Sequence, residues 1–168
     1  MTNEKTLLLS GKQVEQRLNR LAYQIYEDNS KESEIIIAGI QKNGFKLAGH
    51  LAELLKKISS LNIILAEVNI NKHSQYSNVV SVSLSKEELH DKSIVLVDDV
   101  LNSGKTLLYS LRPFLDADIR KIRTAVLVDR NHKSYPIAAD FVGQTLSTTL
   151  LEHVDVEFNG EKGEAWLK

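Results

Sequence analysis

Apolar runs and amphipathic stretches alternate along the chain. Three short runs each contain consecutive apolar residues rich in β-branched side chains, which is typical of strands buried on both faces of a sheet. These predicted strands are EIIIAGI (Glu34–Ile40), SIVLVDD (93–99) and KIRTAVLVDR (121–130). Other stretches repeat apolar residues at helical spacing, and we expect helices over 10–29, 45–58 and 103–115.

The remaining segments complete an alternating order of strands and helices. Ser10 with Gln13, and Ser85 with Glu88, each fit a capping box, a pattern that begins helices. The order predicts an α/β fold with a mainly parallel, doubly wound sheet flanked by helices. The length of 168 residues predicts a single domain over 1–168. Further strands are predicted over 61–70, 79–84, 139–143 and 153–158.

Composition narrows the function classes. The chain has 21 basic and 22 acidic side chains and a net charge of -1, so nothing overall indicates a nucleic-acid-binding protein. It has no cysteine, which excludes disulfides and thiolate metal sites. No apolar run approaches the roughly 18 residues of a membrane span, and the apolar patch in MTNEKTLLLS is too short for a signal peptide. We therefore expect a cytoplasmic protein without a membrane partner.

The most informative stretch is SIVLVDDVLNSGKTL, residues 93–107. Ligands of open α/β sheets bind beyond the carboxyl ends of the strands, and this stretch carries a strand followed by a predicted helix. The GKT string is not a Walker A loop, because that pattern needs a glycine five places before Gly104 and this chain has Asp99 there. The turn nevertheless offers N–H groups, hydroxyls and an ammonium that suit phosphate, from Asn102, Ser103, Gly104, Lys105 and Thr106.

Asp98 and Asp99, side by side before this turn, indicate what else the ligand carries. Carboxylates repel a phosphate, but they accept hydrogen bonds from vicinal sugar hydroxyls. A magnesium ion that bridges hydroxyls and pyrophosphate would offset the repulsion. These residues therefore predict a ribose with a phosphate on one side and a metal-bound pyrophosphate on the other.

At these residues the chain resembles the type I phosphoribosyltransferases, whose signature for 5-phosphoribosyl 1-pyrophosphate (PRPP) is similar to IVLVDDVLNSGKTL. The resemblance implies their fold, a sheet flanked by helices with a small hood. It implies that Asp98 and Asp99 hold the ribose hydroxyls and act in catalysis. It also implies that residues 102–106 bind the 5′-phosphate and that Mg2+ is the cofactor, held mainly by PRPP.

Two further segments, GIQKNGFKLAGHLAELL (39–55) and AVLVDRNHKSYPIAADFVG (125–143), resemble one subfamily. These are the PyrR pyrimidine-operon attenuation proteins, which are also uracil phosphoribosyltransferases. The resemblance implies a homodimer or a larger homo-oligomer and a flexible loop over 71–78 that closes on PRPP, with Lys72 and His73 supplying charge. It implies a pyrophosphate loop at Gln41, Lys42, Asn43 and Gly44, and a base pocket at Val128, Asp129 and Arg130.

The chain departs from the subfamily at several positions. Asn43 stands where the pyrophosphate loop normally has an arginine, and the closing loop is shorter and lacks a Tyr-Arg pair. On the face that binds RNA in the subfamily, the chain keeps basic residues at two matching positions, Arg20 and Arg130. Loss of basic residues there predicts weaker RNA binding, since each phosphate contact adds affinity through counterion release. The positions that are typically basic or histidine carry Tyr23, Asp28, Ala138 and Gln144.

The expected activity is transfer of the phosphoribosyl group from PRPP to a nucleobase, with uracil favoured, giving UMP and pyrophosphate. Two alternatives stay open. One is a weakly or non-catalytic nucleotide-sensing regulator that binds RNA, and the other is a purine phosphoribosyltransferase, a branch that shares the Asp-Asp and Gly-Lys-Thr elements. Arg130 could instead be a surface salt-bridge partner. Tyr23 and Tyr26 of the first helix are candidate contacts with another copy of the chain.

Overall fold

The computed structural model describes residues 5–71, 79–147, 149 and 152–168. A six-stranded sheet has the order β4-β3-β2-β5-β6-β7, and its described pairings are parallel except that of β3 with β4. The predicted α/β fold with a mainly parallel sheet is therefore confirmed. The strands are β2 (Glu34–Ile40), β3 (Asn62–Asn71), β4 (Val79–Val82), β5 (Ser93–Leu101), β6 (Lys121–Asp129) and β7 (Phe141–Thr145).

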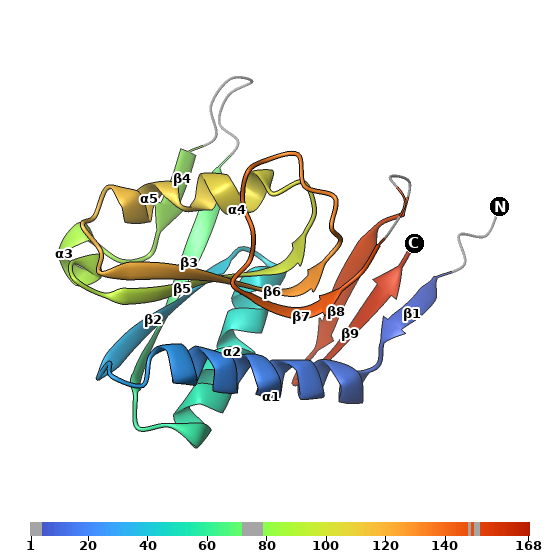
Figure 1. Ribbon diagram of the computed structural model, residues 1–168, viewed down its shortest axis with the longest axis horizontal. Coiled ribbons are helices and arrows are strands. Elements are labelled where there is room, and N and C mark those ends of the chain that lie inside the picture. The colour runs from blue at the N-terminus through green and yellow to red at the C-terminus, as the bar shows by residue number, and fades with distance from the viewer. Residues whose placement is uncertain (1–4, 72–78, 148, 150–151) are drawn as a thin grey trace.

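Helices cover both faces of this sheet, with α1 and α2 on one side and α4 and α5 on the other (Figure 1). Both predicted capping boxes are present: Ser10 Oγ accepts from Gln13 N at 3.3 Å, and Ser85 Oγ accepts from Glu88 N at 3.2 Å. Within the described ranges, no helix has the length and apolar character needed to cross a membrane. The helices are α1 (Gly11–Asp28), α2 (Asn43–Ile58), α3 (Lys86–Leu89), α4 (Lys105–Ser110) and α5 (Arg112–Leu115).

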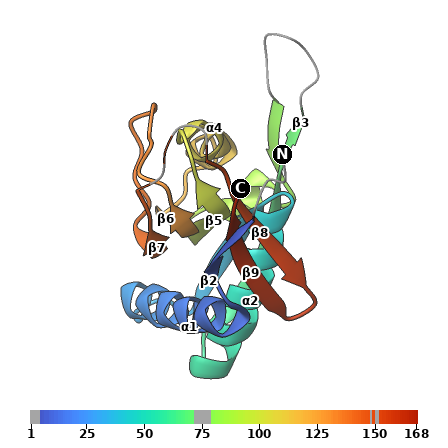
Figure 2. The same ribbon diagram turned by 90° about the vertical axis from the view of Figure 1, so that its right-hand side faces the viewer.

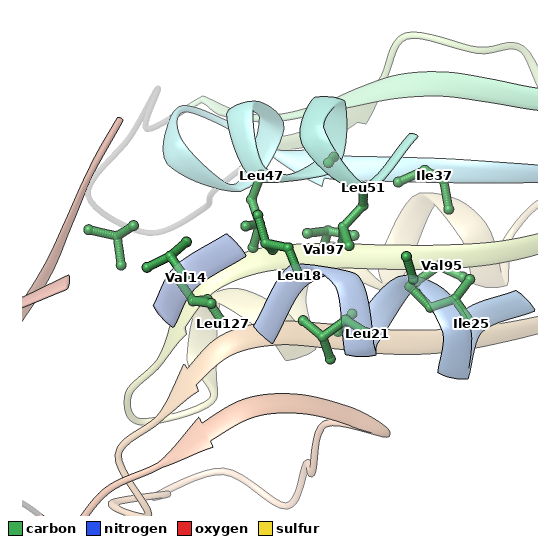
Figure 3. Close-up of a cluster of buried hydrophobic side chains, with 14 of the residues drawn as sticks. Val14, Leu18, Leu21, Ile25, Ile37, Leu47, Leu51, Val95, Val97 and Leu127 are labelled. Carbon is green, nitrogen blue, oxygen red and sulfur yellow. The ribbon is translucent and has the colours of Figure 1, made fainter. Parts of the chain in front are cut away.

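The larger apolar cluster fills the space between α1, α2 and the sheet (Figure 3). Val95 and Val97 of β5 belong to it, whereas Ile94 and Leu96 belong to a second cluster on the opposite face, beside α4 and α5. Strand β5 is thus buried on both faces, as its continuous apolar run predicts. The labelled side chains of the larger cluster, all buried, are Val14, Leu18, Leu21, Ile25, Ile37, Leu47, Leu51, Val95, Val97 and Leu127.

A separate three-stranded antiparallel sheet, which we call the hood, lies beside the main sheet (Figures 1 and 2). Its order is β1-β9-β8, so it joins the beginning of the described chain to its end. The predicted late strand over 153–158 is present, but it belongs to this sheet, and β1 and β9 were not predicted. The three strands are β1 (Thr6–Leu9), β8 (Val154–Asn159) and β9 (Lys162–Leu167).

The helix predicted over 103–115 is two helices, α4 and α5, that meet at Leu111. A continuous helix would need the backbone N–H of Pro113 to bond the carbonyl of Tyr109, and proline has no such donor. Pro113 instead lies in the first turn of α5, where a missing donor is tolerated. The prediction of one helix was therefore wrong, and the missing donor of Pro113 accounts for the break.

Two smaller expectations also change. Strand β5 continues to Leu101, which pairs with Asp129, so Asp98 and Asp99 lie inside the strand rather than at its end. Tyr26 is partly buried and packs against the larger apolar cluster, so less of its side chain is available to another copy. Tyr23 is 58% exposed and keeps that possibility.

Gly39→Ala should destabilise the protein, because its Cβ would lie 2.5 Å from Phe45 Cα and 2.7 Å from Gly44 O, both at the start of α2. Such overpacking typically lowers the free energy of unfolding by about 1–3 kcal/mol. The matched control is Gly49→Ala in α2, where the added methyl group meets nothing within 4 Å and should stabilise the helix by roughly 0.5–1 kcal/mol. Scanning calorimetry measures both, and equal melting temperatures for the two variants would contradict this packing argument.

Candidate active site

The start of α2 lies directly against the carboxyl end of β5. A Cβ on Gly44 would come within 2.8 Å of Val97 O and 3.1 Å of both Cα and Oδ1 of Asp98, so this approach requires glycine. The segment before it has a cis peptide between Gln41 and Lys42. Gln41 Nε2 donates to Ile70 O at 3.2 Å, and Lys42 is exposed where the helix begins. The predicted pyrophosphate loop is therefore next to the predicted catalytic carboxylates.

Asp98 is 9% exposed, and its Oδ1 accepts a hydrogen bond from the backbone N–H of Asp99 at 2.9 Å. Asp99 is partly exposed, and its Oδ1 accepts from Val100 N, also at 2.9 Å. Burial, reinforced by the neighbouring Asp99 charge, raises the pKa of Asp98 well above its usual range. The pair thus combines a buried carboxyl that resists ionisation with a more accessible one.

The two aspartates line different pockets. Successive residues of a strand point to opposite faces, and Asp98 and Asp99 follow this rule. Asp98 lines a small pocket of about 30 Å³ with the predicted phosphate turn, including Asn102, Ser103 and Gly104. Asp99 lines a larger pocket of about 510 Å³ that α2 and the hood share. The other residues of this larger pocket are Asn43, Lys46, Asp155, Val156, Glu157, Phe158 and Asn159.

The phosphate turn has a backbone shape that its neighbours hold in place. Gly104 has φ +87°, which glycine adopts readily, and a Cβ there would lie 2.7 Å from Ile137 Cγ2. The carbonyl of Ser103 accepts hydrogen bonds from the N–H groups of Ser134 and Tyr135, at 2.9 and 3.0 Å. The segment after β6 therefore supports the turn from behind.

The ammonium group of Lys105 and the hydroxyl group of Thr106 remain accessible at this turn. Lys105 is exposed, and its Nζ lies 5.9 Å from the centre of the Tyr109 ring, a cation–π contact. Thr106 is also exposed and lines the small pocket with Asp98. All five predicted phosphate-binding residues therefore lie in one short turn, and four of them line the pocket that Asp98 borders.

The residues predicted for the base pocket lie in and just after the end of β6. Val128 is fully buried, and Asp129 is 8% exposed. Arg130 is 6% exposed, so it is not the surface residue that one interpretation expected. Its Nη1 donates to Asn102 Oδ1 at 2.8 Å, and its Nη2 donates to Thr149 O at 3.1 Å. Arg130 thus joins the phosphate turn to the chain that leads into the hood.

The larger pocket contains groups that sequence reasoning missed. Lys46 lies about one turn after Asn43 on α2 and so shares its face, a signal that was available in the sequence. The contribution of β8 had no local signal, because it comes from a distant part of the chain. Asp155 pairs with Lys168, and Glu157 pairs with Lys5 at 2.9 Å. Three carboxylates and one lysine border this space, and the lysine partners of Asp155 and Glu157 offset two of the three negative charges.

The carboxylate pair offers oxygen ligands of the kind that Mg2+ prefers. Among the described residues, no group of three or more His, Asp or Glu side chains could hold a metal ion. The two carboxylates could add protein oxygens to the coordination of a metal ion that a ligand brings. Lys72 and His73, predicted for the closing loop, lie outside the described residues.

Arg20, one of the two arginines predicted to face RNA, makes contacts within the chain. Arg20 Nη2 donates to Val142 O at 3.0 Å and also to Gly143 O, on β7. Arg17, on the same side of α1, donates to Gln144 Oε1 at 3.0 Å. These contacts fasten α1 to the edge strand of the main sheet, and they occupy part of the hydrogen-bonding capacity of both guanidinium groups.

Asp98→Asn should raise thermal stability at neutral pH. Because the folded state raises the pKa of Asp98, it retains this proton at pH values where the unfolded chain has lost it. The carboxyl therefore lowers the free energy of unfolding as the pH rises above about 3.8, the ordinary pKa. The amide removes this penalty and keeps the acceptor for Asp99 N. At pH 8 the melting temperature of Asp98→Asn should exceed that of the natural protein by about 2–4 °C for each kcal/mol gained in the free energy of unfolding. At pH 3 the variant should have no advantage.

Melting curves from pH 3 to pH 8 measure this difference. Asp116→Asn, at the exposed end of α5, is the control for removing a carboxylate. A constant difference between Asp98→Asn and the natural protein across this range would contradict the role given to burial.

A family model described as a phosphoribosyl transferase domain matches residues 6–159. Relatives named Bifunctional protein PyrR match over most of the chain. The relative from Clostridium kluyveri is 34% identical over 167 residues, covering 92% of this chain and 91% of that protein. The relative from Brevibacillus brevis is 33% identical over 160 residues, covering 91% and 89%.

Solved structures share the fold at lower sequence identity. The hypoxanthine phosphoribosyltransferase of Trypanosoma cruzi has a TM-score of 0.76 at 14% identity, over 95% of both chains. A hypoxanthine-guanine phosphoribosyltransferase from Bacillus anthracis has a TM-score of 0.69 at 19% identity, over 83% of this chain and 81% of that one. The chain therefore belongs to the phosphoribosyl transferase domain family, as a type I member related to the PyrR proteins.

Proposed function

We propose that the protein transfers the phosphoribosyl group of PRPP to a nucleobase, with uracil as the favoured base, forming UMP and pyrophosphate. One observation carries this proposal. Asp98 and Asp99 are neighbours on one strand, yet one borders the pocket of the phosphate turn and the other borders the pocket between α2 and the hood. A ribose that carries a phosphate at one end and a pyrophosphate at C1 matches this arrangement.

The ligand groups can be assigned from the chemistry of each part. The turn over 102–106 supplies backbone N–H groups, hydroxyls and the Lys105 ammonium for the 5′-phosphate. Asp98 and Asp99 accept hydrogen bonds from the ribose hydroxyls. Gln41 to Gly44, at the start of α2, receive the pyrophosphate, where unpaired helix N–H groups favour an anion.

The reaction would proceed with the bond to pyrophosphate breaking ahead of attack by the base, through a ribosyl centre with oxocarbenium character. Asp98 and Asp99 hold the ring, and the more accessible Asp99 carboxylate stabilises positive charge at that centre. Bound Mg2+, with Asp99 as an accessible protein carboxylate, would stabilise the leaving pyrophosphate.

The base is assigned to the space between the hood and the end of β6. Arg130 supports this assignment, because it contacts both Asn102 of the phosphate turn and Thr149 before β8. Uracil is favoured by the resemblance to the PyrR subfamily. Purine transfer is the alternative, since the fold is shared with hypoxanthine phosphoribosyltransferases.

An assay with PRPP, Mg2+ and a panel of uracil, hypoxanthine, guanine and xanthine tests the proposal. Formation of UMP supports it, whereas formation of a purine nucleotide supports the alternative. A salt-dependent RNA titration beside this assay tests the regulator interpretation, because RNA binding through phosphate contacts weakens steeply with salt. Tight RNA binding without product formation would replace the enzyme proposal with the regulator.

Asp99→Asn should lower kcat by at least about tenfold, because the amide has no charge to stabilise the ribosyl centre. The side chain keeps its size, so the melting temperature should change little. Asp118→Asn is the matched control: it makes the same chemical change at an exposed site with φ 52°, a conformation that asparagine tolerates. Steady-state kinetics with the preferred base measures both, and a rate for Asp99→Asn near that of the natural protein would remove Asp99 from the mechanism.

A further inference from the structure

The first two turns of α2 hold the hood through two side chains. Asn43 Nδ2 donates a hydrogen bond to Val156 O at 2.8 Å. The His50 ring stacks on the Phe158 ring, with centroids 5.2 Å apart and an interplanar angle of 21°. Asn43 and His50 are separated by about two helical turns and so share a face of α2. Val156 and Phe158 are two residues apart and so share a face of β8.

The carbonyl that Asn43 binds belongs to an edge strand. The hood has the order β1-β9-β8, so β8 pairs with β9 on one side only. Backbone groups on the other side of an edge strand need partners from elsewhere. Asn43 supplies one for Val156, and this contact lies beside the pocket that Asp99 borders.

The same end of α2 is fixed to the carboxylates. Gly44, the next residue, packs against Val97 O and Asp98 Cα so closely that a methyl group would overlap them. Asn43 and Gly44 therefore connect β8 and β5 through two adjacent residues. This short connection directly links the hood to the strand that carries the aspartates.

We propose that Asn43 is a positioning residue that sets the height of the hood above the reaction site and thereby the affinity for the base. This inference rests on the proposed function, since it assigns the base to the space under the hood. The side chain of Asn43 acts through β8, while the backbone N–H groups at the start of α2 and Lys42 bind the pyrophosphate. If the Asn43 side chain instead bound pyrophosphate directly, its replacement would change the Michaelis constant for PRPP.

Asn43→Leu tests the inference, because leucine has similar size but no hydrogen-bond donor. Loss of one hydrogen bond at a strand edge should speed hydrogen–deuterium exchange of the β8 amides by about fivefold. The Michaelis constant for the base should rise by about fivefold or more, while that for PRPP stays within about twofold. Asn43→Gln keeps the donor on a longer side chain and should restore part of the β8 protection and part of the base affinity.

Glu53→Gln is the control variant, since Glu53 lies on the same helix with an exposed side chain that pairs with Lys56. It should leave β8 exchange and both Michaelis constants unchanged. Unchanged β8 exchange in Asn43→Leu would overturn the inference, as would a rise in the Michaelis constant for PRPP alone. The exchange measurement needs no turnover, so a protein that lacks the proposed activity would still show whether Asn43 holds the hood.

Discussion

The close packing of α2 against β2 and β5 is the constraint on which the rest of the site depends. At Gly39 and Gly44 a side chain would overlap backbone atoms of the neighbouring element, so two glycines permit the helix to begin at this depth. From there its first turn reaches the aspartates on one side and the hood on the other. The phosphate turn is supported independently, by the segment that follows β6. Two rigid parts therefore face each other across β5, and the carboxylates lie between them.

Charged groups at the two ends of the main sheet have different surroundings. At the amino ends of the strands, ionised groups are paired: Arg120 contacts Asp91 and Glu32, and Lys121 contacts Asp28. At the carboxyl ends, Asp98 is buried next to another carboxylate, and its raised pKa records the cost of ionising it there. This arrangement is unfavourable for folding, but it places carboxyl oxygens where sugar hydroxyls and a ligand-borne cation can bind, and such costs to stability are common at functional sites. The large apolar clusters on both faces of β5 compensate for it.

Patterns along the chain were sufficient for the parts of the structure that depend on neighbours in sequence. The buried strands, the long helices and both capping boxes follow from local spacing, and the phosphate turn follows from the residues after β5. Apart from the helix that Pro113 divides, the predictions failed where contacts between distant segments determine the structure. Strands β1 and β9 pair across almost the whole chain, and short polar-containing runs such as KGEAWL carry no signal of that pairing. The contact of Asn43 with Val156 likewise depends on tertiary packing, so the sequence identified the residue but not its partner.

The hood is built from both ends of the described chain, because Thr6 of β1 pairs with Leu167 of β9. During synthesis, the main sheet can form from contiguous βαβ units while β1 still has no partner. The last strands must leave the ribosome before the hood can close, since long-range pairings form only when both segments are present. The phosphate turn and the carboxylates can therefore be in place before the cover over them exists. Synthesis from the N-terminus therefore permits the main sheet and its site residues to fold before the hood closes.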